Sequence, residues 1–555
     1  MMRRAPLAAI ALLALSPPAA SQTQTVGLFQ NDPGAHAGYT LFSPMAYTNT
    51  YLIDINGELV HEWATPYVPG AMGYLLPNGD LLRTARAPTP TPFNAGGFGG
   101  LIQQWDWDGN LVWEFPCSDS TKGSHHDVEA LPNGNVLVIA WVRKTSGEAI
   151  QAGRDPLFLT DGELWSDMIF ELEPDGAGGA TVVWEWDAWD HLIQDFDASA
   201  DNFGVVADRP ELIDINYWEN TGADWLHINS VDYNPDLDQI ALSVPKFDEF
   251  WIIDHSTTTS EAAGHTGGDR NMGGDLLYRW GNPAAHGAGT TSDQLLWYQH
   301  DVHWITPGLP GEGRILLFNN GRNRPEGNFS TVEEIVTTVD SLGNYPQPPS
   351  GTPHGPATQA WIYPAVFDST LFSRGISGAE RMPNGNTLIC EGADGRIFEI
   401  DNSETKYWEY IVPVDANGPI YQYWQPGQNR SFRAPRYETD YPAFDGRDLT
   451  PQGPIELDPT GTGPLPLSAE LALRQNFPNP FRSRTSIAFQ LDHAASGRLD
   501  VYDIQGRLVA NLADGRFDAG MNRFEWRPGR AAAGVYYYRL RVDGREEARR
   551  MVKLR

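Results

Sequence analysis

The sequence predicts an all-β protein: a six-bladed β-propeller followed by a small C-terminal Ig-like β-sandwich. A turn phrase, Pro-Asn-Gly, recurs at residues 77–79, 132–134 and 383–385, each time before a β-prone apolar run. A second phrase, Trp-Glu-Trp or a variant of it, closes alternating strands along the same part of the chain. Recurrence at a spacing of about 50 residues is typical of radial or stacked repeats. Further alternating strands follow a Pro-, Gly- and Thr-rich stretch near the C-terminus.

Each repeat contains two predicted hairpins. Asn-Gly pairs tolerate positive φ, so residues 76–80 form a turn between strands at 74–75 and 81–82. Residues 108–110 turn the strand at 103–107 back into a strand at 111–115. One repeat therefore holds about four short strands, the number found in a propeller blade.

Six such units are recognised by their first strands. They begin near Tyr39, Gly73, His126, His227, His300 and Ser377. Four-stranded units around an axis place their loops at the mouth of a central channel. The alternative is a run of separate β-sandwiches, but these would not need the same turn phrases in the same order. We expect the propeller to span residues 26–445.

The chain of 555 residues has a formal net charge of −32. This length favours more than one domain. The negative charge argues against a nucleic-acid partner, because a phosphate backbone requires a basic face. Any anionic substrate must instead meet a local cationic pocket, which makes individual Arg and His residues informative.

Both ends of the chain predict export. Residues 1–21 combine a basic start, a short apolar core and small residues, the pattern of a secretory signal peptide. No apolar run is long enough to span a bilayer, so no transmembrane segment is expected. Residues 446–467, rich in Pro, Gly and Thr, predict a linker, and residues 468–555 predict the β-sandwich.

The two cysteines, Cys117 and Cys390, lie in different repeats. Buried thiols are the favoured interpretation over a bridge between blades. Neither cysteine has a metal-ligand spacing, and no compact motif such as His-Glu-x-x-His is present. Acidic loops occur only at hairpin turns, where Asp and Asn are expected anyway. We therefore expect no metal and no cofactor.

Histidines cluster at the starts of three units. His126, His227 and His300 occupy equivalent positions, so three blades are expected to direct imidazoles toward the axis. His125 and His303 are interpreted as structural. Convergent imidazoles suit a metal site or, with cationic donors, an anion site. The loop that follows the second strand after His300 carries Arg322 and Arg324, whose fork of donors suits sulfate or phosphate oxygens.

The C-terminal segment carries recognisable phrases at residues 476–481, 502–507 and 533–537. They closely resemble the C-terminal sorting domain of type IX secretion substrates of Bacteroidetes-like bacteria. The resemblance implies the type IX secretion machinery as a partner, and release or attachment at the cell surface. A carbohydrate-binding or linker sandwich is the alternative.

Residues 36–435 resemble bacterial arylsulfate sulfotransferases. The resemblance rests on the opening at 38–44, the Leu-Pro-Asn-Gly-Asn strands, and the segments 224–231, 299–301 and 320–324. It implies a six-bladed propeller that transfers a sulfuryl group from an aryl sulfate donor to a phenolic acceptor without a nucleotide donor. It also implies catalytic roles for His227, His300 and Arg324.

One departure from the family concerns the nucleophile. The family places it late in the last blade, where this chain has residues 390–398 without a histidine. Either His227 or His300 then takes over the attack, or the chemistry has changed. His126, Asn229, Arg322 and Arg396 are the candidate substrate-binding residues. A catalytically silent propeller that binds a ligand or surface partner at its mouth is the alternative function.

Overall fold

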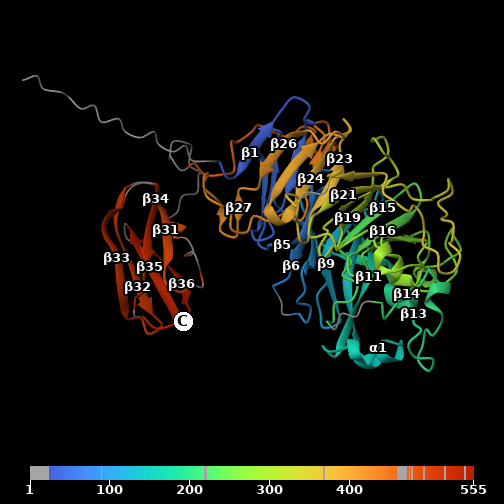
Figure 1. Cartoon of the computed structure of the whole chain (residues 1–555). Helices are drawn as coiled ribbons and strands as arrows, with labels where there is room; N and C mark the ends of the chain where they lie inside the picture. The colour runs from blue at the N-terminus through green and yellow to red at the C-terminus, as the bar shows by residue number, and fades with distance from the viewer. Residues whose placement is uncertain are drawn as a thin grey trace, which may run out of the picture.

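A computed structural model describes most of the chain. It covers residues 24–88, 91–217, 222–366, 369–458, 472–473, 476, 479, 481–491, 494–517, 520–529, 531–542 and 545–554. The predicted signal peptide and residues 459–467 of the predicted linker lie outside this range. Figure 1 shows a large body that contains most of the strands and a second, smaller body at the C-terminal end.

Within the described ranges, residues 27–437 contain six antiparallel sheets of four or five strands each. The first three sheets, in chain order, are β2(Tyr39–Phe42), β3(Asn49–Ile53), β4(Leu59–Ala64) with β29(Arg436–Tyr437); β5(Pro69–Leu75), β6(Leu81–Arg86), β7(Gly100–Trp105), β8(Leu111–Pro116); and β9(Lys122–Ala130), β10(Val136–Thr145), β11(Glu163–Pro174), β12(Ala180–Asp187). The last three are β15(Ser230–Asn234), β16(Gln239–Val244), β17(Glu249–Asp254), β18(Tyr278–Trp280); β19(His300–Trp304), β20(Ile315–Asn319), β21(Thr331–Ile335), β22(Trp361–Tyr363); and β23(Gly378–Arg381), β24(Thr387–Glu391), β25(Arg396–Ile400), β26(Lys406–Ile411) with β1(Gly27–Asn31).

The hairpins predicted from the turn phrases are confirmed. β5 pairs with β6 across residues 76–80, and β7 pairs with β8 across residues 106–110. The Trp-Glu-Trp phrase and its variants lie in the last strand of a unit, in β4, β8, β12, β18 and β26. The phrase marks this strand because its large aromatic residues pack between neighbouring sheets, as Trp63, Trp186 and Trp408 do in full burial.

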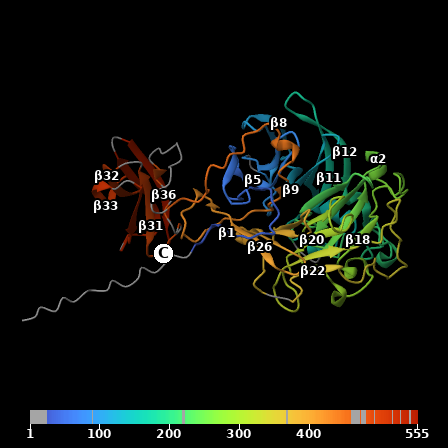
Figure 2. The same ribbon diagram turned by 90° about the horizontal axis from the view of Figure 1, so that it is seen from above.

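The first strands of successive sheets contact one another in chain order: β2 with β5, β5 with β9, β9 with β15, β15 with β19, and β19 with β23. The sheets are therefore arranged side by side in sequence order (Figure 2). The two ends of residues 27–437 each add a strand to a sheet at the opposite end of the order. β1 pairs with β26 in the sixth sheet, and β29 pairs with β2 in the first sheet.

Side chains near the starts of these first strands hydrogen-bond to the next sheet. Asp127 accepts from the backbone N–H of Val231 at 3.3 Å. Ser230 Oγ accepts from Val302 N–H at 3.0 Å, and Asp301 accepts from Ala379 N–H at 2.9 Å. Three successive sheet-to-sheet steps use the same kind of bond, which fixes the strand starts relative to one another.

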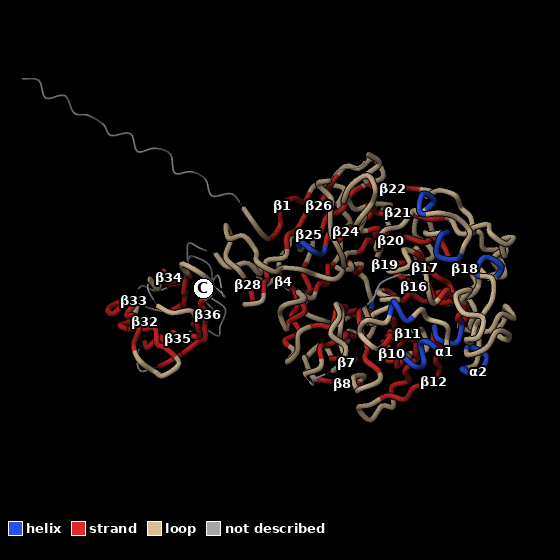
Figure 3. Tube along the Cα trace, turned by 60° about the horizontal axis from the view of Figure 1, so that its bottom comes forward, coloured by secondary structure: helices blue, strands red, loops and turns tan. Residues whose placement is uncertain are grey.

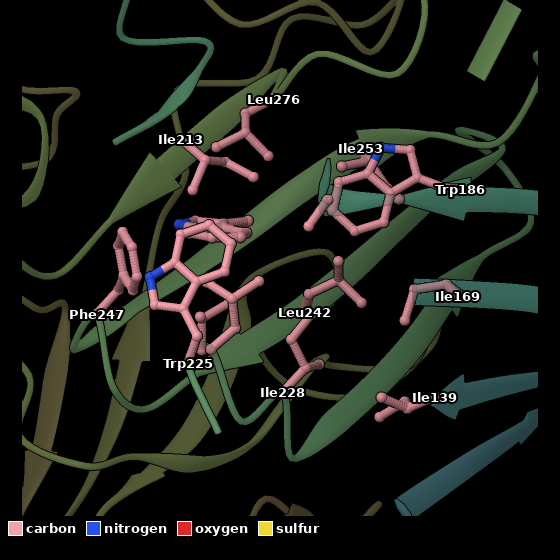
Figure 4. Packing of buried hydrophobic residues seen from close by; sticks show 14 of the residues in the cluster. Ile139, Ile169, Trp186, Ile213, Trp225, Ile228, Leu242, Phe247, Ile253 and Leu276 are labelled. Atoms are coloured by element: carbon pink, nitrogen blue, oxygen red, sulfur yellow. The ribbon is translucent and has the colours of Figure 1, made fainter. Parts of the chain in front are cut away.

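The largest apolar core lies between the third and fourth sheets. Figure 4 shows Ile139, Ile169 and Trp186 from the third sheet facing Leu242 and Ile253 from the fourth. All five side chains are buried. Alternate residues of one strand belong to this core, as Ile240, Leu242 and Val244 of β16 do, which is the period-two pattern of a sheet that faces a core.

Helices are short and peripheral. Figure 3 shows α1(Ser146–Gln151) and α2(Thr259–Ala262) outside the strands, where α1 contacts β10 and β11 and α2 contacts β12. Seven short 3-10 turns also occur in the described ranges: Pro156–Phe158, Ala188–His191, Val206–Asp208, Pro283–His286, Thr291–Asp293, Gly392–Asp394 and Pro442–Phe444. Two-stranded pairs are formed by β13(Leu192–Ile193) with β14(Ile213–Asp214) and by β27(Val414–Asp415) with β28(Gly418–Pro419). None of the helices in this part of the chain is long and apolar enough to cross a membrane.

The C-terminal body consists of two antiparallel sheets. They are β30(Ala472–Leu473), β31(Thr485–Leu491), β34(Gly520–Trp526) and β33(Leu508–Phe517), β32(Ala495–Asp503), β35(Gly534–Val542), β36(Arg545–Lys553). Both sheets contribute to one buried core, which includes Phe489, Val501 and Leu540.

The first part of the predicted linker is held by the first sheet. Gln452 N–H donates to the Leu59 carbonyl, and Leu59 N–H donates to the Gly453 carbonyl, each at 2.8 Å. The predicted buried thiols are confirmed, since Cys117 and Cys390 are both free and buried.

Candidate active site

Three histidines from three sheets gather around one phenyl ring. The rings of His126 and His227 are 4.6 Å apart, centroid to centroid. Phe432 lies 5.9 Å from His126 and 6.1 Å from His300. The backbones of His126 and His227 have φ of 55° and 60°, a region that residues with a side chain rarely adopt. Strain of this kind is concentrated at functional sites.

His227 forms a dyad with Asp224. Its Nδ1 lies 2.6 Å from Asp224 Oδ2, so Nδ1 carries the proton and Nε2 is left with a lone pair. Nε2 has no hydrogen-bond partner among the residues described. Burial raises the pKa of Asp224, but electrostatic interactions and hydrogen bonds with His227 and Lys246 hold it below its usual range. Lys246 Nζ lies 3.0 Å from the same carboxylate.

His300 is hydrogen-bonded at both ring nitrogens. Its Nδ1 donates to Asn320 Oδ1 at 2.7 Å, because the Asn320 amide nitrogen donates to two backbone carbonyls. Its Nε2 accepts from the backbone N–H of Ile376 at 3.1 Å. Burial lowers the pKa of His300 to about 3. His300 is therefore a neutral ring without a free lone pair.

His126 is the end of a buried row of polar groups. Its Nδ1 is hydrogen-bonded to His125 Nδ1 at 2.8 Å. His125 Nε2 lies 2.6 Å from Asp167 Oδ1, a close contact that lacks hydrogen-bond alignment. His125 also stacks on Trp141 at 3.9 Å. Burial, reinforced by neighbouring His227, puts the pKa of His125 and that of His126 well below their usual range. Burial and nearby Asp224 raise the pKa of Asp167 well above its usual range.

Gly97 leaves room for the outer edge of the His126 ring. A Cβ atom at this position would lie 2.2 Å from His126 Nε2. Gly97 has φ of 79°, and its carbonyl accepts from the His126 backbone N–H at 2.8 Å. Only glycine combines this backbone conformation with the close approach.

A buried ion cluster lies beside the histidines. Arg433 Nη2 lies 2.8 Å from Asp127 Oδ2, and its Nε lies 2.9 Å from Asp301 Oδ1. Asp127 follows His126 in sequence and Asp301 follows His300, so this guanidinium joins β9 to β19. Burial opposes the charge on Arg433, but the two carboxylates raise its pKa above the usual range.

Replacing Arg433 with Met should destabilise the large body. The change leaves two buried carboxylates facing each other without their cation, a loss that costs about 3–5 kcal/mol in comparable pairs. The measurement is the urea midpoint, with exposed Arg374→Met as the matched control. Equal midpoints for the two variants would contradict this link between β9 and β19.

A cavity of about 260 Å³ adjoins Arg433. Its lining includes the carboxylates of Glu129, Asp232 and Glu380 together with His303. Burial raises the pKa of Asp232 to about 6 and that of Glu380 to about 7, each against the influence of His303. The carboxylates make this cavity unsuited to binding an anion. In contrast, His126 and His300 are neutral rings, and His227 is paired with Asp224.

Arg322 packs against Tyr298, which lies two residues before His300. Its guanidinium lies 4.7 Å from the ring of Tyr298, which interacts electrostatically with both Arg322 and Asp224. Arg322 is partly exposed, and no carboxylate pairs with it in the residues described. The Tyr298 carbonyl also faces His300 Nδ1 at 3.2 Å. Tyr298 therefore connects Arg322, a residue predicted from the sequence, to the edge of the group of histidines.

Arg324 is not brought to the histidines. Its guanidinium lies between the rings of Trp297 and Phe329, at 4.7 and 4.5 Å, and donates to Thr331 Oγ1 at 2.7 Å. Glu333 Oε1 lies 3.5 Å away. These partners belong to the fifth sheet and its loops, because the turn at 320–324 folds Arg324 back under the strand.

Two other predicted residues are engaged in contacts within a sheet or between sheets. Arg396 pairs with Glu391 at 3.1 Å and Glu409 at 2.6 Å within the sixth sheet. Asn229 is buried and donates from its amide to the Gln299 carbonyl at 2.9 Å, which joins the fourth and fifth sheets. The segment just before the sixth sheet brings the Ile376 backbone N–H, not a histidine, to His300.

Sequence reasoning missed the partners of the histidines. Asp224 stands three residues before His227, a spacing that is a usable signal for an orienting carboxylate. The other partners, Asp167, Lys246 and Arg433, belong to no repeated phrase. Each of them is distant in sequence from the residue that it contacts at the site. Only the fold brings them into contact.

Comparison with known proteins now bears on this geometry. Residues 31–338 match the family model of the arylsulfotransferases (ASST), which is more than half of the chain. The chain belongs to the arylsulfotransferase family. This membership supports an arylsulfotransferase-like function, and the matched residues include all three gathered histidines.

The C-terminal body of this arylsulfotransferase-family protein has its own match. Residues 475–554 match the secretion system C-terminal sorting domain. A type IX sorting domain indicates secretion or attachment at the cell surface. No curated protein matches the chain.

Solved structures similar to the chain are distant. A protein of unknown function from Bacteroides caccae is 11% identical, covers 67% of this chain and 93% of its own, with a TM-score of 0.34. A putative 6-phosphogluconolactonase from Bacteroides fragilis is 10% identical, with 73% and 100% covered and a TM-score of 0.35. Virginiamycin B lyase from Staphylococcus aureus is 9% identical, with 71% and 91% covered and a TM-score of 0.28. Scores this low support no conclusion about this chain.

Proposed function

We propose that the protein is an exported enzyme that transfers a sulfuryl group from an aryl sulfate to a phenol through His227. The single observation that carries the proposal is the Asp224–His227 dyad, which orients the ring and leaves its Nε2 without a hydrogen-bond partner among the described residues. The six sheets are taken as six blades of one propeller around these histidines, over residues 26–445. The C-terminal sheets are taken as an Ig-like sandwich.

His227 attacks the donor. Its Nε2 lone pair forms a bond to sulfur while the bond between sulfur and the aryl oxygen breaks, which leaves a sulfohistidine and a phenolate. Asp224 holds Nδ1–H and stabilises the positive charge that develops on the ring. His300 cannot supply the attack, because both of its nitrogens are already bonded. Its role is to hold Asn320 and the Ile376 backbone beside the site.

His126 supplies the proton. The step requires a protonated Asp167 whose O–H turns toward His125 Nε2, which lies 2.6 Å away but is not hydrogen-bonded to it in this structure. His125 Nδ1–H then donates to His126 Nδ1, and His126 Nε2 bears a hydrogen. Transfer of that hydrogen to the phenolate moves each proton one step along this row. Asp167 is left ionised, and both histidines remain neutral. The directions of the three pKa shifts agree with this order, since the extra proton is held by Asp167.

The second half reverses these steps. The acceptor phenol gives its proton to His126 Nε2, and its oxygen attacks the sulfur of the sulfohistidine. The bond between nitrogen and sulfur breaks, so His227 is regenerated and Asp167 is again protonated. One group therefore acts first as acid and then as base, as a ping-pong transfer requires.

Lys246 and Arg322 are the cations for the sulfate oxygens. Lys246 Nζ lies 3.0 Å from Asp224 Oδ2. The Arg322 guanidinium lies over the Tyr298 ring and pairs with no carboxylate among the residues described, so its N–H groups can donate to sulfate oxygens. The charge of these two cations offsets the repulsion that a molecule of net charge −32 exerts on an anion. Arg322 thus replaces Arg324 in the role that the family resemblance suggested.

The test uses p-nitrophenyl sulfate with and without a phenol. We expect steady release of nitrophenolate only when the phenol is supplied, together with formation of the aryl sulfate of that phenol. Continuous release without phenol would instead show hydrolysis. No release from any aryl sulfate tested would favour a silent ligand-binding propeller, which the missing histidine of the sixth sheet makes the second candidate.

A further inference from the structure

A second group of histidines lies away from the active site, between the third and fourth sheets. His191 ends the turn that follows β12, whereas His265 and Asp275 belong to the connection between β17 and β18. Asp275 Oδ1 lies 2.8 Å from His191 Nδ1 and 2.7 Å from His265 Nδ1. The three ligand atoms all lie within 4.8 Å of one another.

The tautomer of His191 is fixed by its other nitrogen. Nε2 faces the Ala262 carbonyl at 2.8 Å, and a carbonyl can only accept, so Nε2 carries a hydrogen. A neutral His191 then directs the lone pair of Nδ1 at a carboxylate oxygen. Two electron-rich atoms at this distance require a positive charge between them, either a proton or a metal ion.

The surroundings hold His191 in this orientation. Trp186 stacks on the imidazole at 5.7 Å with an interplanar angle of 7°, and its indole N–H donates to the Gly274 carbonyl at 2.7 Å. A Cβ atom at Gly274 would lie 2.6 Å from His191 Nε2. A backbone carbonyl that accepts from the far nitrogen is the usual outer partner of a metal-binding histidine.

Access and charge also suit a cation. His191 and Asp275 are buried, but the side chain of His265 is 54% exposed, so the group opens to solvent on one side. Asp190 interacts with both imidazoles and adds negative charge. Arg209 also interacts with Asp275, but its guanidinium is hydrogen-bonded to Glu211.

We propose that His191, His265 and Asp275 bind a divalent transition metal ion of the Zn²⁺ class. Two imidazole nitrogens and one carboxylate oxygen are the ligands this class prefers, and water completes a four-coordinate site. Ligand distances of about 2.0–2.2 Å require the three atoms to separate slightly, which the exposed His265 side chain permits. The bound ion would join the segment after β12 to the connection between β17 and β18.

The test is isothermal titration of the chelator-treated, tag-free full chain with ZnCl₂ at neutral pH, with a thermal melt of the same samples. We expect one bound ion per chain and a rise in Tm on addition of metal. His265→Ala should weaken binding at least about tenfold and abolish the rise in Tm. Because this side chain is exposed, the variant is expected to fold.

His36→Ala is the matched control, since His36 is also paired with a carboxylate, Glu438 at 2.8 Å, but has no second imidazole beside it among the residues that the structure describes. It should bind zinc as the native chain does. Absence of binding by the native chain, or equal affinity in His265→Ala, would overturn the proposal and leave His191 as a protonated ion-pair partner. Neither result depends on transferase activity.

Discussion

His227→Ala should lower the rate of sulfuryl transfer by about 10³-fold or more, because it removes the imidazole whose Nε2 attacks sulfur and whose Nδ1 is held by Asp224. Asp224 would remain, paired with Lys246 at 3.0 Å, so the surrounding loop is expected to keep its fold. The measurement is steady-state release of nitrophenolate from p-nitrophenyl sulfate in the presence of a phenol.

His36→Ala serves as the control for this variant, because its partner Glu438 lies outside the group of gathered histidines. The control should retain native activity. If His227→Ala kept more than a tenth of the native rate while folding normally, the nucleophile would have to be another residue.

Asp167→Asn should lower kcat by about 10²-fold, the lower end of the range for lost acid–base catalysis. An amide keeps the volume and accepts the Asp167 hydrogen bonds from the backbone, but it cannot store and release a proton. His126 Nε2 would then be fixed in one state. Because Asp167 does not touch the substrate, KM should change little.

The leaving group separates this role from a merely structural one. The loss in Asp167→Asn should be larger for phenyl sulfate than for p-nitrophenyl sulfate, since nitrophenolate leaves without much help from an acid. Asp187→Asn is the control: Asp187 pairs with Lys144 at 3.2 Å in the same sheet and has no link to the histidines. An equal loss for both donors would refute the relay.

Much of the fold could be predicted from local signals. Pro-Asn-Gly and Asp-Gly-Asn phrases determine a turn within a few residues, so β5 to β8 lie where the hairpins predict. The aromatic phrase identifies the last strand of a unit, and the last strand of the fifth sheet, β22, also carries aromatic residues, Trp361 and Tyr363. The order of the sheets follows because neighbouring repeats in sequence contact one another.

The site could be predicted only in part. His126, His227 and His300 stand at equivalent repeat positions, and their convergence follows from that equivalence. Arg324 shows the limit of spacing arguments, because a turn can direct either of two nearby arginines toward the site. The fold buries Arg324 between Trp297 and Phe329 and leaves Arg322 over the Tyr298 ring.

The partners that define chemical roles could not be predicted at all. Asp167 and His126 are 41 residues apart in sequence, and Arg433 is 306 residues from Asp127, which it contacts. No periodicity encodes such pairs. The tautomers of His300 and His227 depend on Asn320 and Asp224, so only the folded geometry distinguishes a blocked ring from a free one.

The most direct test is to locate the sulfuryl group. The protein is mixed with excess p-nitrophenyl sulfate without acceptor, and its peptides are analysed by mass spectrometry under conditions that preserve phosphoramidate-like bonds. We predict a burst of one nitrophenolate per chain and one added SO₃ group on the peptide that contains His227. A burst with the added group on the peptide of His126 or His300, or release without any modified histidine, would contradict the account.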